Sequence, residues 1–450
     1  MLLYLAFLIR NYCALFLNNF FTLFKQNMLD RKTPPLIKAA DNLLLPKAAV
    51  SYLRNDIPVH TINMGTQDIV KIEVVFFSGR PYEDKKLVAR STSRLLKEGT
   101  VDKSASEIAE QIDFYGGTIS IPVNLDTTNI TFYSLSKHLD ALLPLLGEII
   151  CAPSFPQEEM DALIANSRQR LKIDLSKNDI IAYRNITENI FGKEHPYGYN
   201  SEALLYDQLD REDLIQHHQK NMVAGNTMIF LSGKIDDQVL KKVDRYLGDI
   251  PQGTKRERSV FPELPTVVKK EHLHHSDTVQ TAVRIGRRLF NRAHPDFYGM
   301  YVLNTILGGY FGSRLMENIR EKKGYTYNIY SSMDTMMFDG YFYVGTEVSN
   351  DLTQKAVEEI YHEMEVLQND LISEKELLIV RNYLLGSLLT MLDGPLNIIN
   401  VVKETVSEGM PEHHFETLVK NIQHISPQEL RDLAQKYFRK EDFWELTVGK

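Results

Sequence analysis

The chain has only two cysteines, Cys13 and Cys151, among its 450 residues. So few cysteines exclude a disulfide framework and any zinc site built from several cysteines, and they fit a reducing compartment. Basic residues are outnumbered by acidic ones, which gives a formal net charge of -8. This balance argues against nucleic acid as a general partner, because phosphate binding needs a basic face. The length exceeds one ordinary hydrophobic core and predicts two to four domains.

No apolar run is long enough to span a bilayer, which takes about 20 residues. Residues 1–27 are apolar, but Arg10, Asn11, Asn18 and Asn19 interrupt them. They also lack the basic start and small-residue cleavage site of a signal peptide. Three alternatives stay open: an upstream extension with Met28 as the true start, which we favour, a membrane-surface helix, or a degenerate signal. The first predicts a cytoplasmic protein, and a real targeting segment would predict a periplasmic or membrane-associated one.

After a lead-in, the chain alternates between strand and helix patterns. Residues 69–78, IVKIEVVFFS, indicate a buried strand. Ser104 and Glu107 form the capping-box pattern of a helix start. Further helices are expected over 85–98, 136–150, 156–175, 179–191, 211–221 and 236–247, and strands over 49–53, 59–63, 118–123, 127–134 and 227–232. Residues 249–265, rich in proline and charge, predict a linker.

The second part of the chain repeats this order of elements. Strands are expected over 279–285, 341–348 and 443–448, and helices over 294–307, 351–368, 373–392, 411–422 and 427–438. Residues 210–234 also align with residues 426–450 without a gap, at a constant offset of 216. Leu214 then meets Leu430, and both segments end in Gly-Lys. The sequence predicts an N-terminal extension and lead-in (1–45), two homologous α+β halves (46–248 and 266–450) and the linker 249–265 between them.

The stretch LGGYFGSRLMENIREKKGYTYNIYS, residues 307–331, combines a glycine loop, a short helix and an aromatic strand. The loop holds Gly308, Gly309 and Gly312, and the helix ends near Arg320, seven positions before Tyr327. A guanidinium and a phenol held close together can bind a carbonyl oxygen or a peptide backbone. Taken alone, the stretch is more typical of a capped amphipathic helix with a solvated last-turn arginine.

Two such halves, together with this stretch, resemble the pitrilysin-like zinc peptidases of the mitochondrial-processing-peptidase type, over about residues 46–450. In that family a helix carries His-x-x-Glu-His, in which the histidines bind zinc and the glutamate activates water, and a later helix supplies a third ligand. The matching helix here is LVARSTSRLLKEGT, with Arg90, Ser93 and Arg94 at the motif positions. Gln169 and Arg170 stand near the third ligand position.

The resemblance therefore implies a chain that binds no zinc itself and is inactive alone. For Arg90 and Arg94 we expect a solvated helix face or a pair with a carboxylate such as Glu98. The family pairs zinc-bearing subunits with subunits that carry the Arg/Tyr pair, here Arg320 and Tyr327, and this chain resembles the second kind. The resemblance also implies a fold of two mostly antiparallel sheets packed by helices into a clam-like shell. The implied partner is a homologous zinc-bearing subunit, and the implied function is peptide binding in a heterodimeric metalloendopeptidase.

Two alternatives remain beside this interpretation. One is a scaffold subunit like the core proteins of the respiratory cytochrome bc complex, and the other is a stand-alone enzyme with an unrecognised site. Histidines offer the latter little support. His272 and His274 lack a third ligand, and the adjacent pairs His217-His218 and His413-His414 are expected at the surface. Cys151 is expected to be a buried structural thiol.

Overall fold

The computed structural model describes residues 43–255, 257, 267, 269–275 and 278–450. The described residues all belong to one compact unit. The predictions for residues 1–27 and for Met28 lie outside the described residues, as does most of the predicted linker. The boundaries of the two halves stay a prediction.

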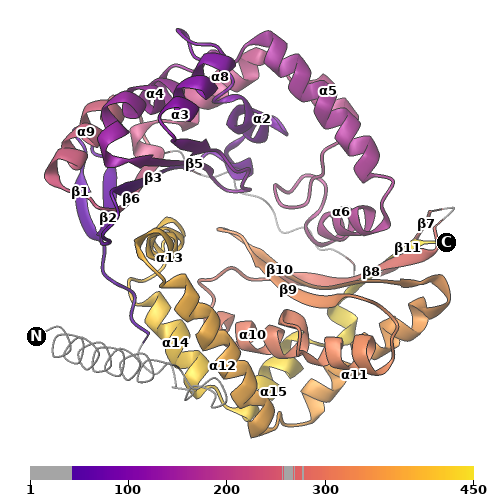
Figure 1. Cartoon of the computed structure of the whole chain (residues 1–450). Coiled ribbons are helices and arrows are strands. Elements are labelled where there is room, and N and C mark those ends of the chain that lie inside the picture. Colours follow the sequence, from indigo (N-terminus) through magenta and orange to yellow (C-terminus); the bar gives the residue numbers. More distant parts are fainter. Residues whose placement is uncertain (1–42, 256, 258–266, 268, 276–277) are drawn as a thin grey trace, which may run out of the picture. The chain divides into compact units, whose positions relative to one another are not determined.

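Six strands of the N-terminal half form one sheet in the order β1-β2-β6-β3-β5-β4 (Figure 1). Only β2 and β6 run parallel, and the other neighbours are antiparallel. The strands are β1 (Ala49–Tyr52), β2 (Pro58–Asn63), β3 (Ile69–Phe76), β4 (Thr118–Ser120), β5 (Thr128–Leu135) and β6 (Thr227–Gly233). The helices of this half are α2 (Val88–Leu95), α3 (Ala105–Phe114), α4 (Leu139–Cys151), α5 (Gln157–Asp174), α6 (Asn178–Phe191), α7 (Ala203–Asp207), α8 (Arg211–Asn221) and α9 (Asp237–Leu247).

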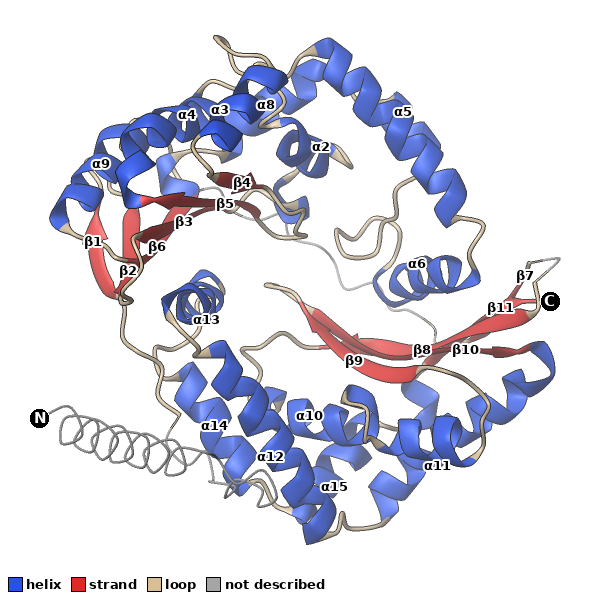
Figure 2. Ribbon diagram, viewed as in Figure 1, coloured by secondary structure: helices blue, strands red, loops and turns tan. Residues whose placement is uncertain are grey.

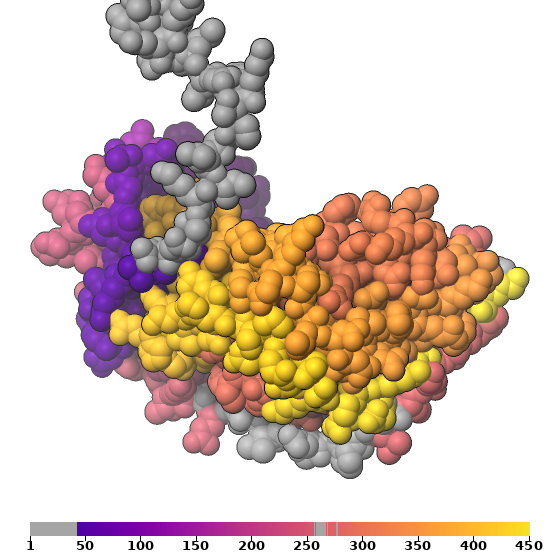
Figure 3. All heavy atoms as spheres, turned by 90° about the horizontal axis from the view of Figure 1, so that it is seen from below, coloured from indigo at the N-terminus to yellow at the C-terminus, as the bar shows by residue number. Residues whose placement is uncertain are grey.

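Five strands of the C-terminal half form a second sheet in the order β7-β11-β8-β10-β9 (Figure 2). They are β7 (Lys270–His274), β8 (Gln280–Leu289), β9 (Ile329–Thr335), β10 (Gly340–Ser349) and β11 (Trp444–Gly449). The helices are α10 (Phe297–Asn304), α11 (Thr353–Asn369), α12 (Glu374–Met391), α13 (Pro395–Ser407), α14 (His414–His424) and α15 (Pro427–Tyr437). Two π-helices, Thr305–Gly309 and Met316–Lys322, lie on either side of residues 310–315. Gly308 and Gly309 of the predicted glycine loop belong to the first of these helices. Figure 3 shows α12, α14 and α15, in orange and yellow, on the outer face of this half.

The two sheets have the same topology. In each, the last strand of the half lies between the first two strands of the common core and runs parallel to one of them: β6 beside β2, and β11 beside β7. The capping boxes agree as well, because Asp210 with Asp213 starts α8 and Ser426 with Glu429 starts α15, at the offset of 216 residues. The predicted fold class, two related halves of mostly antiparallel sheet packed by helices, is confirmed.

Each half also lends one helix to the other. Helix α6 of the first half packs on β8 and β11, whereas α13 of the second half packs on β2 and β6. Ala182 and Ile186 of α6 join Leu446 and Val448 in one apolar cluster. Ile398, Ile399 and Val402 of α13 join Ile62, Val75 and Phe230 in another. Part of the second face of each sheet is thereby covered by a helix from the other half.

This exchange explains two buried charges in β3. Because side chains alternate along a strand, Val70, Ile72 and Val74 enter the core of their own half, while Lys71 and Glu73 face α13. Both charged side chains are 3% exposed. The Glu73 carboxylate accepts from Lys71 Nζ at 3.1 Å and from Lys403 Nζ of α13 at 2.6 Å.

Three sequence expectations need correction. The helix expected over 85–98 is shorter, because Leu87 adopts a left-handed conformation (φ 72°) and α2 begins only at Val88. The strand expected from Tyr325 begins at Ile329. Helix α13 was not predicted, although it corresponds to α6 at the same offset. Among the described helices, none alone is long and apolar enough to cross a bilayer, and the pair α12 and α13 meets that test only together, across a bend of 107°.

Candidate functional site

Helix α2 carries Arg90, Ser93 and Arg94, the positions at which the resemblance to the family predicts His-x-x-Glu-His. Arg90 and Arg94 are one turn apart and therefore lie on the same side of the helix. Arg94 is exposed, whereas Arg90 is half-buried and its Nε is a buried donor without a hydrogen-bond partner. Within the described residues, neither guanidinium forms an ion pair with Glu98. The expected solvated face is therefore correct for Arg94 and wrong for Arg90.

Ser93 points into the core of the first half. Its Oγ donates to the Ala89 carbonyl oxygen at 2.9 Å and lies 2.7 Å from Thr128 Oγ1 of β5, to which Ser78 Oγ also donates at 2.9 Å. The side chain is therefore held by core hydroxyls and is no general base at neutral pH.

Arg170 of α5 completes this group of residues, because α2 packs against α5. Partial burial lowers the pKa of Arg94, and the neighbouring positive charges of Arg90 and Arg170 lower it further. The structure thus places the charges of Arg90, Arg94 and Arg170 near one another. That Arg90 and Arg94 stand at two zinc-ligand positions of the family, and Gln169 or Arg170 near the third, stays a prediction from the resemblance. A guanidinium has no lone pair for a cation, so these residues do not fit a zinc ion. In the described part of the chain there is also no cluster of three or more His, Cys, Asp or Glu side chains suited to a metal.

Glu83 stabilises the start of α2 and was not singled out in the sequence. Its carboxylate accepts from the Ala89 backbone N–H at 3.1 Å and from the Tyr199 hydroxyl. Burial raises the pKa of Glu83 to about 7, although both hydrogen bonds act in the opposite direction. An acidic residue just ahead of a helical pattern is the signal that could have indicated this role.

The glycine loop is packed closely between its neighbours. A Cβ atom on Gly308 would collide with the backbone nitrogen of Ser331 in β9, so only glycine allows this approach. Tyr310 packs against Tyr383 of α12, with ring centroids 4.8 Å apart and ring planes tilted by 30°. Phe311 is 68% exposed. The guanidinium carbon of Arg320 lies over the Phe311 ring, 4.7 Å from the ring centroid. Tyr310 and Phe311 therefore fasten the two sides of the loop to α12 and to Arg320.

Arg320 belongs to the π-helix Met316–Lys322, a wide helical turn that is frequent at functional sites. Leu315, Met316 and Ile319 are buried, as predicted, and Gly324 ends the helix in a left-handed conformation (φ 65°). The Arg320 guanidinium also forms an ion pair with the adjacent Glu321. A ligand carbonyl at Arg320 would therefore compete with this carboxylate.

Tyr327 stands free of the sheet. Thr326 Oγ1 donates to the Glu347 carbonyl oxygen at 2.7 Å and accepts from the Asn328 backbone N–H at 3.2 Å. This local turn replaces strand pairing before Ile329 and leaves Tyr327 92% exposed. Arg320 and Tyr327 line one hollow of about 430 Å³, together with Glu321 and Tyr325. The structure thus brings the predicted pair together.

Other sequence expectations had mixed outcomes. His217 and His218 are buried rather than at the surface, and their Nε2 atoms lie 2.9 Å from the Ser78 carbonyl oxygen and 2.7 Å from the Ile150 carbonyl oxygen. His413 is exposed, but His414 is buried and lies 2.8 Å from the Tyr298 hydroxyl. Burial raises the pKa of the Cys151 thiol to about 11, which fits an unreactive structural cysteine.

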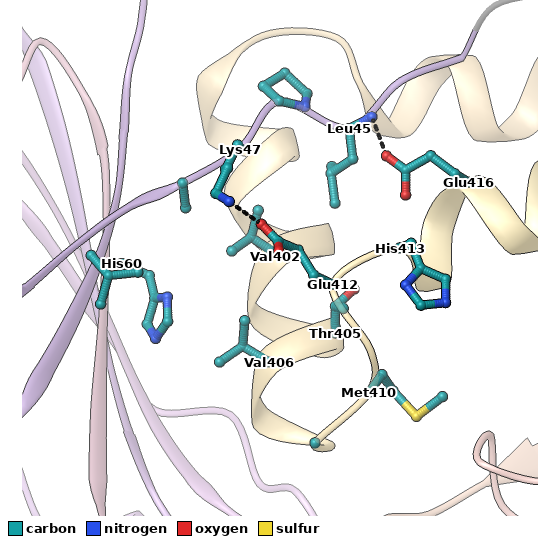
Figure 4. Close-up of a pocket in the computed structure, with 14 residues that line it drawn as sticks. Leu45, Lys47, His60, Val402, Thr405, Val406, Met410, Glu412, His413 and Glu416 are labelled. Atoms are coloured by element: carbon teal, nitrogen blue, oxygen red, sulfur yellow. Dashed lines mark hydrogen bonds and ion pairs between the residues drawn. The ribbon is translucent and has the colours of Figure 1, made fainter.

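A larger hollow of about 760 Å³ lies elsewhere, where the lead-in to β1 passes between β2 and helices α13 and α14 (Figure 4). Val402, Val406 and Met410 make part of its wall apolar. Lys47 and Glu412 form an ion pair at its edge at 2.7 Å, and both side chains are exposed. None of the predicted site residues lines it.

Comparisons with known protein families and sequences identify related proteins. Residues 59–196 match the model of insulinase, peptidase family M16, and residues 208–384 match that of the peptidase M16 inactive domain. The non-peptidase homolog YmxG of Helicobacter pylori is 25% identical over 405 residues, which cover 87% of this chain and 89% of that protein. An uncharacterized zinc protease YmxG of Bacillus subtilis is 24% identical over 346 residues, covering 76% of this chain and 83% of that protein.

Solved structures share the fold. A peptidase M16 inactive domain from Pseudomonas fluorescens has a TM-score of 0.83 at 20% identity, covering 89% of this chain and 98% of that one. A chain of complex III2 from Candida albicans has a TM-score of 0.71 at 14% identity, covering 89% and 96%. From its two sheets and its family matches, we conclude that the chain belongs to peptidase family M16, and the comparisons support an inactive, non-peptidase homologue.

Proposed function

We propose that this protein is the non-catalytic, substrate-binding subunit of a heterodimeric zinc metalloendopeptidase that acts on unfolded peptides. The observation that carries the proposal is that Arg320 and Tyr327 line one hollow, while the positions of the zinc ligands hold arginine. The zinc and the general base then belong to a homologous partner chain with an intact His-x-x-Glu-His motif, whose active site this subunit completes.

The chemistry of the pair suits this role. A guanidinium donates two parallel hydrogen bonds to a carbonyl or carboxylate, and a phenol donates one to developing negative charge. The 92% exposure of Tyr327 leaves its hydroxyl accessible to another chain. Strand β9, which follows Tyr327, is an edge of the second sheet. An edge strand offers backbone hydrogen bonds to an extended peptide, so β9 supports a peptide as the ligand.

Mixing the purified protein with its zinc-bearing homologue tests the proposal. Peptidase activity should appear only in the mixture, and Arg320→Ala or Tyr327→Phe should lower kcat/KM by about 10-fold to 100-fold, as the loss of one oxyanion donor does. Lys322→Ala is a matched control, since Lys322 lies in the same helical turn but pairs with Glu317 at 2.8 Å. Full activity of the partner alone would refute the proposal.

Glu321→Gln gives a change in the opposite direction. The substitution removes the carboxylate that pairs with Arg320, so the guanidinium becomes available to a substrate carbonyl. KM of the mixture should fall by a few-fold, on the order of one ion-pair contribution. A rise in KM would show that the ion pair positions Arg320 rather than competing with substrate.

A scaffold role is the second candidate, because a chain of complex III2 from Candida albicans has the same fold. In that case the protein would co-purify with a large assembly. Arg320→Ala and Tyr327→Phe would then leave the assembly and its activity unchanged, whereas the peptidase proposal requires a loss.

A further inference from the structure

The group formed by Arg90, Arg94 and Arg170 is positively charged, whereas the ligands of a metal ion are neutral or negatively charged. Arg90 and Arg94 share one side of α2, and Arg170 approaches from α5. Arg170 is 83% exposed, so the group opens to solvent on its α5 side. On the α2 side, the Nε of Arg90 is buried. Three like charges on two packed helices repel one another unless an anion lies among them.

Among the described residues, one carboxylate pairs with this group, and it is shared with a lysine. Asp174 lies 3.8 Å from Arg170 Nε, but it is also 3.6 Å from Lys177 Nζ. Among the described residues, neither Arg90 nor Arg94 forms an ion pair. The other polar group near Arg94 is the phenol of Tyr206, a buried side chain. By contrast, Arg168, two residues before Arg170 on α5, has its own partner in Asp207 at 2.6 Å.

The buried Nε–H of Arg90 has no hydrogen-bond acceptor among the residues that the structure describes, and this indicates which kind of group would complete the site. A buried charged donor is costly when it is left without an acceptor, and the acceptor that suits several guanidiniums is a planar or tetrahedral oxyanion bound through paired N–H groups. We propose that Arg90, Arg94 and Arg170 form an oxyanion-binding site, for a carboxylate or a phosphate, at the position where relatives bind zinc. This site is independent of the role proposed for Arg320 and Tyr327, which lie in the other half of the chain.

The test uses the full-length protein and two kinds of probe at low ionic strength. Inorganic phosphate is titrated calorimetrically, with sodium chloride at matched ionic strength as the reference. A short peptide with a free C-terminal carboxylate is compared with the same peptide as its C-terminal amide. Saturable binding of phosphate with equal, weak binding of both peptides assigns the site to phosphate. Preference for the free carboxylate over the amide assigns it to a peptide terminus.

Substitutions then locate the binding. Arg94→Gln should weaken binding of the preferred probe at least 10-fold, and Arg94→Lys, which keeps the charge but loses the paired donors, should have an intermediate effect. Arg168→Gln is the matched control and should leave binding unchanged, because residues two apart on a helix point about 200° away from each other. Arg170→Gln repeats the test at an exposed position if Arg94→Gln fails to fold.

Stability without the probe gives a second readout. Removal of one of three mutually repelling charges should raise the Tm of Arg94→Gln above that of the wild type at low salt, and added phosphate should raise the Tm of the wild type more than that of the variant. The proposal is overturned if the wild type binds neither probe saturably. It is equally overturned if Arg168→Gln weakens binding as much as Arg94→Gln does.

Discussion

Ile186 of α6 and Val402 of α13 occupy equivalent positions 216 residues apart, and each packs into the apolar cluster on the sheet of the other half. Ala182 and Ile190 correspond in the same way to Ile398 and Val406. The duplication therefore preserves a reciprocal contact as well as a fold. Since each sheet needs the other half's helix to cover part of one face, neither half has a complete core by itself.

Shortening a buried side chain on either exchanged helix, α6 or α13, should destabilise the whole unit. Ile186→Ala and Ile398→Ala remove buried side chains that are 0% and 3% exposed, and each should lower the free energy of unfolding by about 2–5 kcal/mol. Asn397→Ala, at an exposed neighbouring position of α13, should change it by less than about 0.5 kcal/mol. Denaturant unfolding measures all three. An effect below about 1 kcal/mol for either isoleucine would contradict the importance of the exchange.

Removing the Glu73 carboxylate alone should destabilise the protein more than replacing Lys71, Glu73 and Lys403 together with apolar side chains. Glu73→Gln leaves Lys71 and Lys403 without their buried partner, which typically costs about 3–5 kcal/mol. Replacing the three residues together, by Lys71→Met, Glu73→Leu and Lys403→Met, should bring stability back to near the wild-type value, because buried ion pairs are often replaceable by apolar groups. Equal losses in the single and triple variants would refute this account.

Glu83 should make stability depend on pH. Its folded pKa of about 7 lies above the ordinary value of 4.5, so between these values the folded state keeps a proton that the unfolded state releases. The stabilisation is complete below pH 4.5 and is lost as the pH rises through 7. Because a tenfold change in proton affinity corresponds to about 1.4 kcal/mol, the loss should be on the order of 3 kcal/mol.

Glu83→Gln keeps a neutral side chain at every pH, so the contribution of this position to the unfolding free energy should no longer depend on pH. The measurement is the difference in unfolding free energy between wild type and variant at pH 5 and at pH 8, which cancels the titration of other groups. Burial also raises the pKa of Glu408 to about 7, so Glu408→Gln should remove a second, separate component. A difference that is the same at both pH values would exclude Glu83 as a source.

Restoration of metal ligands should convert the arginine group into a zinc site. Arg90→His, Arg94→His and Arg170→Glu together place two imidazoles and a carboxylate where three protein ligands are needed. The triple variant should bind about one zinc ion per chain, measured by elemental analysis after gel filtration, and the wild type is the reference. If the folded triple variant retains no more zinc than the wild type, Arg170 is not the position that faces Arg90 and Arg94.

Local patterns predicted much of the fold. The capping box at Ser104, the buried strand over 69–76 and the helices over 157–174 and 211–221 are all found where the sequence indicates them. The duplication and the loss of the zinc motif were also readable from residue identities alone. These features depend on contacts between residues that are close in sequence, or on direct comparison of aligned letters.

The contacts between distant residues were decided by tertiary structure. Nothing in the letters around Lys71 and Glu73 shows that these charges are buried as a group, because Lys403, the second cation paired with Glu73, is 330 residues away from Glu73 and on a helix that was not predicted. The burial of His217 and the start of β9 at Ile329 also depend on neighbours from other segments.

The same division holds at the two sites. The resemblance to the family indicated Arg320, Tyr327, Arg90 and Arg94 as residues of interest. Only the folded chain shows that Phe311 and Glu321 hold the guanidinium of Arg320, and that Arg170 adds its charge to Arg94. The physical reason is that a residue's identity fixes which interactions it can form, whereas its burial and its charged neighbours are set by segments that meet only after the chain has folded.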